Sequence, residues 1–274
     1  MSELTKKYIK ELDAGIRDLF ESERWTGYLR FLARFHRYSV NNTLAIYAQR
    51  PDATLVASFT DWRRMGRSVK KDEHGMKIIA KHETKETDET TGKEKRRIGF
   101  HLAHCFDVSQ TAGDALPENP CQTLRADIDG YDALLASLRD VSPAPIEIKA
   151  IQSAANGYYL PDNDQIVVKA GLSQAQTVKT TIHEIAHAML HGRGKSHEKT
   201  DQRTREVQAE SVAYVVCQCI GVDSSDYSFG YVAGWSRDKE LKELKASIKA
   251  ISSTADRIIA GLKIQKGGAT CVKD

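Results

Sequence analysis

A His-Glu-x-x-His pattern at residues 183–187 is the part of the sequence best suited to chemistry. Apolar residues three and four apart predict a helix around it, with Ser173 as the N-cap. Side chains four apart share one helix face, so His183 and His187 can bind one ion. Glu184 is placed to take a proton from a water that the metal activates. The pattern predicts a Zn²⁺ site, with other divalent transition metals as alternatives.

A third protein ligand is expected, because catalytic zinc usually keeps three and leaves one position open. His191 continues the histidine stripe, but it would lie about 12 Å from His183 along a helix, too far to share an ion. A second expected helix, residues 204–214, carries Glu206 and Glu210 four apart. We expect Glu206 to bind the metal and Glu210 to orient a histidine. An exchange of these roles, or two solvated glutamates, are the alternatives.

The alternative to a metal site is a surface helix with incidental histidines. Ile185, Ala186, Ala188 and Met189 make the segment apolar. Buried polar side chains need partners on such a helix, which favours the metal site.

Composition is ordinary for a soluble globular protein, with 41% hydrophobic and 28% charged residues in a chain of 274. No apolar run reaches the roughly 20 residues that span a bilayer, and the N-terminus lacks the apolar core of a signal peptide. Five scattered cysteines fit a reducing compartment better than a disulfide framework. We therefore expect a cytoplasmic protein without a membrane partner. The sequence does not indicate an oligomeric state.

From Ser109 to Thr123 the composition shifts to Thr, Gly, Asp, Pro and Asn, with Pro117 and Pro120. This shift predicts a linker at residues 113–126 between a domain at 1–112 and a second at 127–274. The first domain holds 21 Lys and Arg against 16 Asp and Glu, and the remainder holds 19 against 21. The first domain is therefore the better partner for a polyanion.

The expected fold class is α+β. In the first domain, apolar periodicity predicts helices within residues 2–48 and hairpins over residues 69–80 and 76–108. The second domain is expected to be mostly helical with a small β-sheet. Its last helix, residues 239–262, carries an apolar stripe that predicts docking against the chain itself or a partner.

The order of a strand hairpin, the His-Glu-x-x-His helix and a Glu-x-x-Ala-Glu helix resembles the gluzincin metallopeptidases over residues 127–235. This resemblance implies zinc-dependent hydrolysis of a peptide bond, with Glu184 as the catalytic base. It does not indicate which protein or peptide would be the substrate.

Four segments of the first domain are similar to the N-terminal domain of ArdC-type antirestriction proteins: residues 37–44, 49–53, 62–71 and 105–111. The resemblance implies a domain that binds single-stranded DNA, joined to a zinc-metallopeptidase-like domain. Such proteins are carried by conjugative plasmids and integrative elements and protect incoming DNA from host restriction. The chain departs from the family pattern at Lys81, where a long charged hairpin begins.

Single-strand binding requires aromatic faces for bases and cations for phosphates. The candidate DNA-binding residues are Arg37, Tyr38, Asn42, Trp62, Arg63, Arg67, Lys70, Lys71 and Lys77. The alternatives are a core position for Trp62 and a merely solvated basic face for the cations. Two other functions stay open: a cytosolic zinc peptidase that cleaves a regulatory protein, and a binding module whose metal only stabilises the fold.

Overall fold

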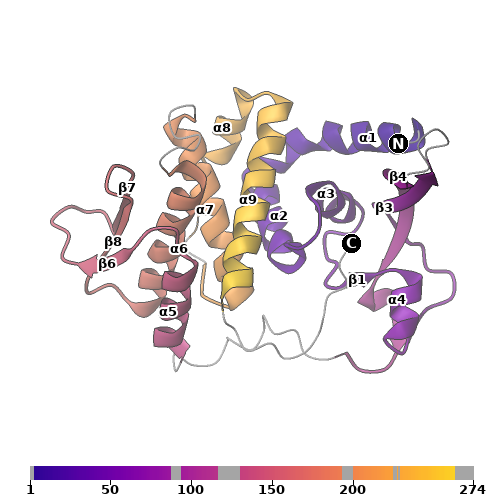
Figure 1. Ribbon diagram of the computed structural model, residues 1–274, viewed down its shortest axis with the longest axis horizontal. Coiled ribbons are helices and arrows are strands. Elements are labelled where there is room, and N and C mark those ends of the chain that lie inside the picture. Colours follow the sequence, from indigo (N-terminus) through magenta and orange to yellow (C-terminus); the bar gives the residue numbers. More distant parts are fainter. Residues whose placement is uncertain are drawn as a thin grey trace. The chain divides into compact units, whose positions relative to one another are not determined.

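The structure is a computed structural model that describes residues 3–87, 94–116, 130–192, 200–224, 227 and 229–262. Its elements are mixed α+β, as expected (Figure 1). The described residues form two compact units. Unit 1 comprises residues 3–16 and 37–116, and unit 2 comprises residues 17–36 and 130–262.

The second helix, α2 (Ser22–Phe35), departs from the expected division at residue 112 because it belongs to unit 2. It packs against helix α7 (Gln202–Ile220). Its residues Trp25, Leu29 and Leu32 are buried, and the Trp25 indole N–H donates to Ser211 Oγ of α7 at 3.2 Å. The apolar face of α2 is thus part of the core that surrounds the metal-site helices.

Unit 1 has a three-stranded antiparallel sheet in the order β1 (Val56–Ala57), β4 (Glu94–Asp107) and β3 (Met76–Thr87). The expected hairpin over residues 76–108 is therefore confirmed. The expected hairpin over 69–80 is wrong, because β2 (Arg67–Val69) pairs with β5 (Thr111–Gly113) instead.

Arg67 accounts for this pairing. Its guanidinium donates to Thr111 Oγ1 at 2.8 Å, to the Thr111 carbonyl at 3.2 Å and to the carbonyl of Asp114. These contacts fasten β2 to the segment that follows β4.

The helices of unit 1 are α1 (Glu3–Leu19), whose residues after Ile16 belong to unit 2, then α3 (Val40–Gln49) and α4 (Phe59–Arg64). Helix α3 lies along the outer edge of β3. The Asn42 side chain accepts from the Ile79 N–H at 2.8 Å and donates to the Ile79 carbonyl at 3.0 Å. Gln49 makes the same pair of bonds with the backbone of Lys77, at 2.9 Å each.

Unit 2 combines a small sheet with a helical core. In the sheet, β6 (Ile146–Lys149) is parallel and β7 (Gly157–Leu160) antiparallel to the central β8 (Gln165–Lys169). The helices besides α2 and α7 are α5 (Tyr131–Val141), α6 (Gln174–His191), α8 (Val232–Arg237) and α9 (Leu241–Gly261). Helix α7 lies between α6 and α9 and packs against both (Figure 1).

The apolar stripe of α9 is buried within unit 2. Leu244, Ile248, Ile251, Ala255 and Ile258 are all buried, and α9 packs on α5, α6 and α7. The expected docking of the last helix therefore occurs against the chain itself.

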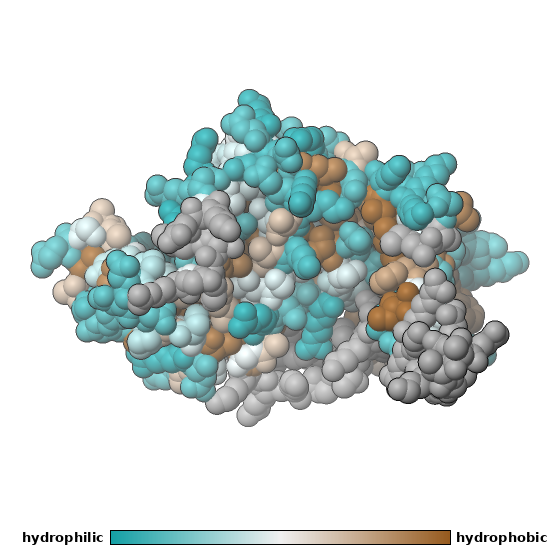
Figure 2. All heavy atoms as spheres, turned by 45° about the horizontal axis from the view of Figure 1, so that its top comes forward, coloured by the Kyte–Doolittle hydropathy of each residue, from teal (hydrophilic) through white to brown (hydrophobic). Residues whose placement is uncertain are grey.

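The face drawn in Figure 2 is mainly hydrophilic, with hydrophobic atoms in scattered groups. No helix in the described part of the chain is long and apolar enough to cross a membrane.

Candidate metal centre

His183 and His187 project from α6 toward Glu206 of α7. Ser173 begins α6 as predicted, since its hydroxyl accepts from the Gln176 N–H at 3.2 Å. The two histidine Nε2 atoms are 3.0 Å apart. Each lies 3.6 Å from a different oxygen of the Glu206 carboxylate. Among the described residues, His183, His187 and Glu206 form the group whose potential ligand atoms lie close enough together, within 4.8 Å of one another, to hold one metal ion.

These separations fit a shared divalent ion. Zinc–nitrogen and zinc–oxygen bonds of about 2.0–2.1 Å in a tetrahedron place neighbouring donors about 3.4 Å apart. Two imidazole nitrogens at 3.0 Å are satisfied only when a proton or a cation lies between them. Two imidazoles and one carboxylate are also a donor set that borderline divalent metals accept.

Even without a cation, the two histidines favour the ionised form of the Glu206 carboxyl group. Hydrogen bonds from His183 and His187 lower the pKa of Glu206 far below its usual range, and burial opposes them only in part. Burial acts to lower the pKa of His183, but hydrogen bonding to Glu206 and the nearby carboxylates raise it overall. Glu206 therefore remains ionised at neutral pH, as a metal ligand must be.

Glu184 lies beside the ligands and faces the sheet. It is only 6% exposed, and burial raises its pKa while the two histidines oppose that effect. The backbone N–H of Tyr159, in β7, donates to its carboxylate. Gly157 permits this approach, because a Cβ there would lie 2.6 Å from Thr180 Cγ2 and 3.3 Å from Glu184 Cγ. The position suits a proton acceptor held close to the metal.

Glu210 lies one turn after Glu206 and borders the same site. Burial raises its pKa to about 7. It accepts a hydrogen bond from the Tyr231 hydroxyl, and among the described residues no hydrogen bond joins it to a histidine. Glu210 also lines a cleft of about 380 Å³ together with Gly157, Lys179, His183, Glu184 and Tyr227. The cleft gives a substrate direct access to Glu184 and the first histidine.

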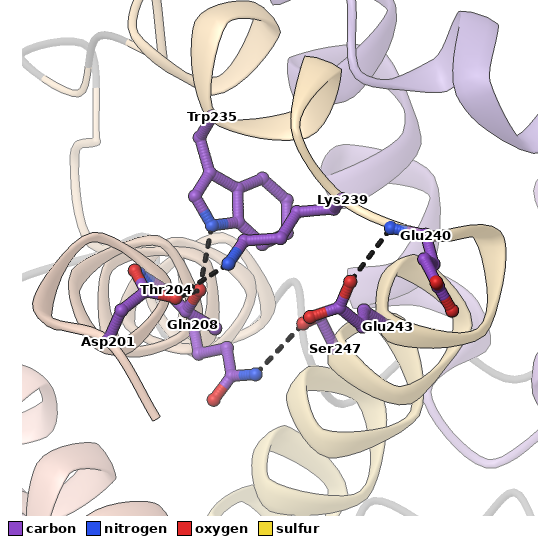
Figure 3. A network of polar contacts seen from close by, with 8 residues as sticks. All are labelled: Asp201, Thr204, Gln208, Trp235, Lys239, Glu240, Glu243 and Ser247. Atoms are coloured by element: carbon purple, nitrogen blue, oxygen red, sulfur yellow. Dashed lines mark hydrogen bonds and ion pairs between the residues drawn. The ribbon is translucent and has the colours of Figure 1, made fainter. Parts of the chain in front are cut away.

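A polar network fixes the start of α7 and thereby the position of Glu206 (Figure 3). Asp201 is the N-cap, accepting from the Thr204 N–H at 2.9 Å and from Lys239 Nζ at 2.6 Å. The Trp235 indole N–H donates to Thr204 Oγ1 at 2.8 Å. One turn later, Gln208 donates to Ser247 of α9 at 3.0 Å. The segment from α8 to α9 therefore holds the helix that carries Glu206.

Two of the candidate DNA-binding residues lie in the core of unit 1, which corrects the prediction for them. Trp62 is 0% exposed and its indole N–H donates to the Phe106 carbonyl at 2.9 Å, so its ring cannot receive a base. Asn42 is buried and bonded to the β3 backbone. The guanidinium of Arg67 is hydrogen-bonded to Thr111 of β5. The half-buried Tyr38 donates to the Val56 carbonyl at 2.9 Å.

The other candidates carry exposed cationic side chains: Arg37, Arg63, Lys70, Lys71 and Lys77. Lys70 Nζ also donates to the Ser109 carbonyl at 2.8 Å.

Sequence reasoning missed Tyr231 beside Glu210, and it missed the exposed aromatic rings of Phe59 and Phe100 in unit 1. The alternation of polar and apolar residues in β4 could have indicated Phe100. Nothing in the sequence pattern indicates the contact between Tyr231 and Glu210.

Two family comparisons match separate parts of the chain. Residues 1–106 match the N-terminal domain of the anti-restriction factor ArdC. Residues 145–217, which include the three candidate ligands, match the IrrE N-terminal-like domain of the M78 peptidase type.

Among curated proteins, an uncharacterized protein of Bacillus anthracis is 27% identical over 304 residues. The match covers 94% of this chain and 51% of that protein, so the chain spans about half the length of this relative.

Solved structures with the same fold include two of the antirestriction protein ArdC from the R388 plasmid. The metal-free form is 17% identical, with a TM-score of 0.55 over 97% of this chain and 100% of that chain. The Mn(II)-bound form is 19% identical, with a TM-score of 0.51 over 83% and 84%. The chain is thus similar to the ArdC N-terminal domain over residues 1–106 and to the IrrE-like, M78 peptidase-like domain over residues 145–217, which agrees with the resemblance to ArdC-type proteins found in the sequence.

Proposed function

We propose that this protein binds single-stranded DNA, holds a zinc ion, and serves a mobile genetic element by protecting its incoming DNA from restriction in the cytoplasm of the recipient cell. The domain pair supports this proposal, since ArdC is described as an anti-restriction factor and one solved ArdC comes from a plasmid. The exposed cations of unit 1 supply the charge that a DNA backbone requires.

The observation that carries the metal-dependent part is the convergence of His183, His187 and Glu206 beside Glu184. Zinc held there would act as a Lewis acid and make water a stronger nucleophile. Glu184 would accept the proton of the attacking water and deliver it to the leaving group. Glu206 would keep its negative charge and fix both imidazoles by its position on α7. The cleft would orient an extended substrate against Gly157 and Lys179.

The proposal is tested by fluorescence anisotropy with a labelled single-stranded oligonucleotide across a salt series, with duplex as competitor. We expect affinity that falls steeply with salt and prefers the single strand. Substituting Lys70 and Lys71 together by Gln should flatten the salt slope by about 2, while Lys242→Gln on α9, an exposed lysine of unit 2, should leave it unchanged. Absence of binding at low salt would refute DNA protection.

A second candidate function is proteolysis of a regulatory protein, with unit 1 as the substrate adaptor. The buried Glu184 at the cleft favours it, because a purely structural metal site has no need of a proton acceptor. Glu184→Gln should abolish cleavage while retaining the metal. Proteolysis that survives this substitution would exclude the mechanism. A purely structural metal would instead leave every cellular effect intact in Glu184→Gln and melt unit 2 in His183→Ala.

A further inference from the structure

One face of the hairpin formed by β3 and β4 carries apolar side chains that are open to solvent. Ile98 is 54% exposed and Phe100 is 39% exposed, and Leu102, His104 and Phe106 follow them at every second position of β4. Residues two apart in a strand share a face, so these side chains form one stripe.

The opposite face of the same hairpin is buried where β3 begins and β4 ends. Met76 and Cys105 are directly opposite one another in the register and both are buried. A sheet with one face packed normally exposes polar side chains on the other. At the level of Phe100 the opposite face carries the exposed side chains of His82 and His101, so Ile98 and Phe100 are the apolar side chains that this end of the hairpin leaves in solvent. Such apolar surface generally marks an interaction site.

A second exposed aromatic ring extends the stripe at its other end. Phe59 begins α4, is 50% exposed, and meets the half-buried Phe106 edge to face with ring centroids 6.5 Å apart. Phe106 lies six positions after Phe100, which corresponds to about 20 Å along the strand. We call Phe59, Phe106, Leu102, Phe100 and Ile98 the aromatic stripe.

Cationic side chains flank the aromatic stripe on the neighbouring strand. The register places Lys81 directly opposite Phe100 and Lys77 directly opposite His104 of β4, so both lysines share the face of the stripe. Both are exposed. Lys81 contacts Glu83 at 2.9 Å, but a solvent-exposed pair of this kind contributes little and leaves the ammonium available to another anion.

We propose that the aromatic stripe is the surface on which unpaired bases of single-stranded DNA stack, with Lys81 and Lys77 binding the phosphates alongside. This inference rests on the proposed function and locates its DNA contact. Bases offer flat apolar faces only when they are unpaired, and exposed aromatic rings beside cations match both parts of a nucleotide. A protein partner would cover the apolar rings, but it gives no reason for the two lysines, Lys77 and Lys81, on the same face.

Loss of one stacking ring predicts a large effect on binding. Stacking contributes about 1–3 kcal/mol per base, so Phe100→Ala should weaken single-strand affinity about 5- to 150-fold. Phe100→Leu keeps an apolar side chain but removes the ring, and it should weaken binding similarly. Phe100→Tyr keeps the ring and should bind the single strand as tightly as wild type. Lys81→Gln should reduce the salt slope by about 1, and Glu83→Gln should strengthen binding at low salt.

The experiment is anisotropy with a single-stranded oligonucleotide on the full chain, comparing wild type with these variants. His101→Ala is the matched control, because His101 is exposed and adjacent to Phe100 but points to the opposite face. No binding by wild type would refute the proposed function and this site with it. If wild type binds, and if Phe100→Leu and Phe59→Ala bind as tightly as the control His101→Ala, this site alone is overturned. A stripe that instead serves a protein partner gives this second result.

Discussion

Metal binding should stabilise unit 2 specifically, because the donors come from two different helices of that unit. Free Zn²⁺ at 100 times its dissociation constant adds about 2.7 kcal/mol to the free energy of unfolding of a protein that binds it only when folded. Unit 2 has about 150 residues, for which 1 kcal/mol raises Tm by about 2–4 °C. We therefore expect its Tm to rise by about 5–11 °C.

The assay is differential scanning calorimetry of the chelator-treated protein with and without Zn²⁺, after the dissociation constant has been measured by chelator competition. The transition of unit 1 provides an internal control, since none of the donors belongs to it. The unit 2 transition should move and the unit 1 transition should not. His104→Ala, which removes an exposed histidine of unit 1, should leave the shift intact.

Substitutions at the two glutamates decide which one binds the metal. Glu206→Gln removes the charged donor and should reduce the shift strongly at the same metal concentration. Glu210→Gln changes the same chemical group one turn away and should retain most of the shift. An unchanged shift in a variant lacking both His183 and His187 would refute the reasoning, as would loss of the shift in Glu210→Gln alone.

Three further predictions concern stability. Asp107, buried in unit 1, accepts bonds from the Thr54, Leu55 and Ser109 N–H groups and the Ser109 hydroxyl; Asp107→Asn should cost about 3 kcal/mol in urea unfolding, and a change below 1 kcal/mol would contradict this. Trp25→Phe should cost about 1–3 kcal/mol because buried Ser211 loses a donor, and adding Ser211→Ala should recover part of that loss. Partial burial acts to raise the pKa of Asp201, but Lys239 and Thr204 lower it overall, so its stabilisation is complete above about pH 4 and is lost as pH falls toward the lower folded pKa. Asp201→Asn should remove this acid dependence from the unfolding free energy of unit 2. A pH profile that this substitution leaves unaltered would show that ionised Asp201 does not stabilise unit 2.

The metal-site helix could be predicted from sequence because every signal for it is local. The Ser173 cap, the apolar spacing and the four-residue separation of His183 and His187 all act within one helix. Glu206 could be predicted as a candidate ligand for a related reason, since two carboxylates on a partly apolar helix need partners for their charge. The candidate donor set of two imidazoles and one carboxylate then followed from the residue types alone.

Features that depend on contacts distant in sequence could not be predicted. Arg67 joins β2 to a segment more than 40 residues away, and no periodic pattern in residues 69–80 reveals that choice. The grouping of α2 with unit 2 depends likewise on a helix about 180 residues later. Trp62 illustrates a further difficulty, because an aromatic side chain beside several cations suits a DNA platform and a core equally well until its burial is known.

The bonds from Asn42 and Gln49 to β3 also affect how the protein behaves in a crowded cell. An outer strand with free N–H and carbonyl groups invites another chain to add as a neighbouring strand, which is a common start of aggregation. Here two amide side chains of α3, seven residues apart, occupy those groups at Lys77 and Ile79 as a strand would. Helix α3 therefore blocks the addition of a further strand at the start of β3.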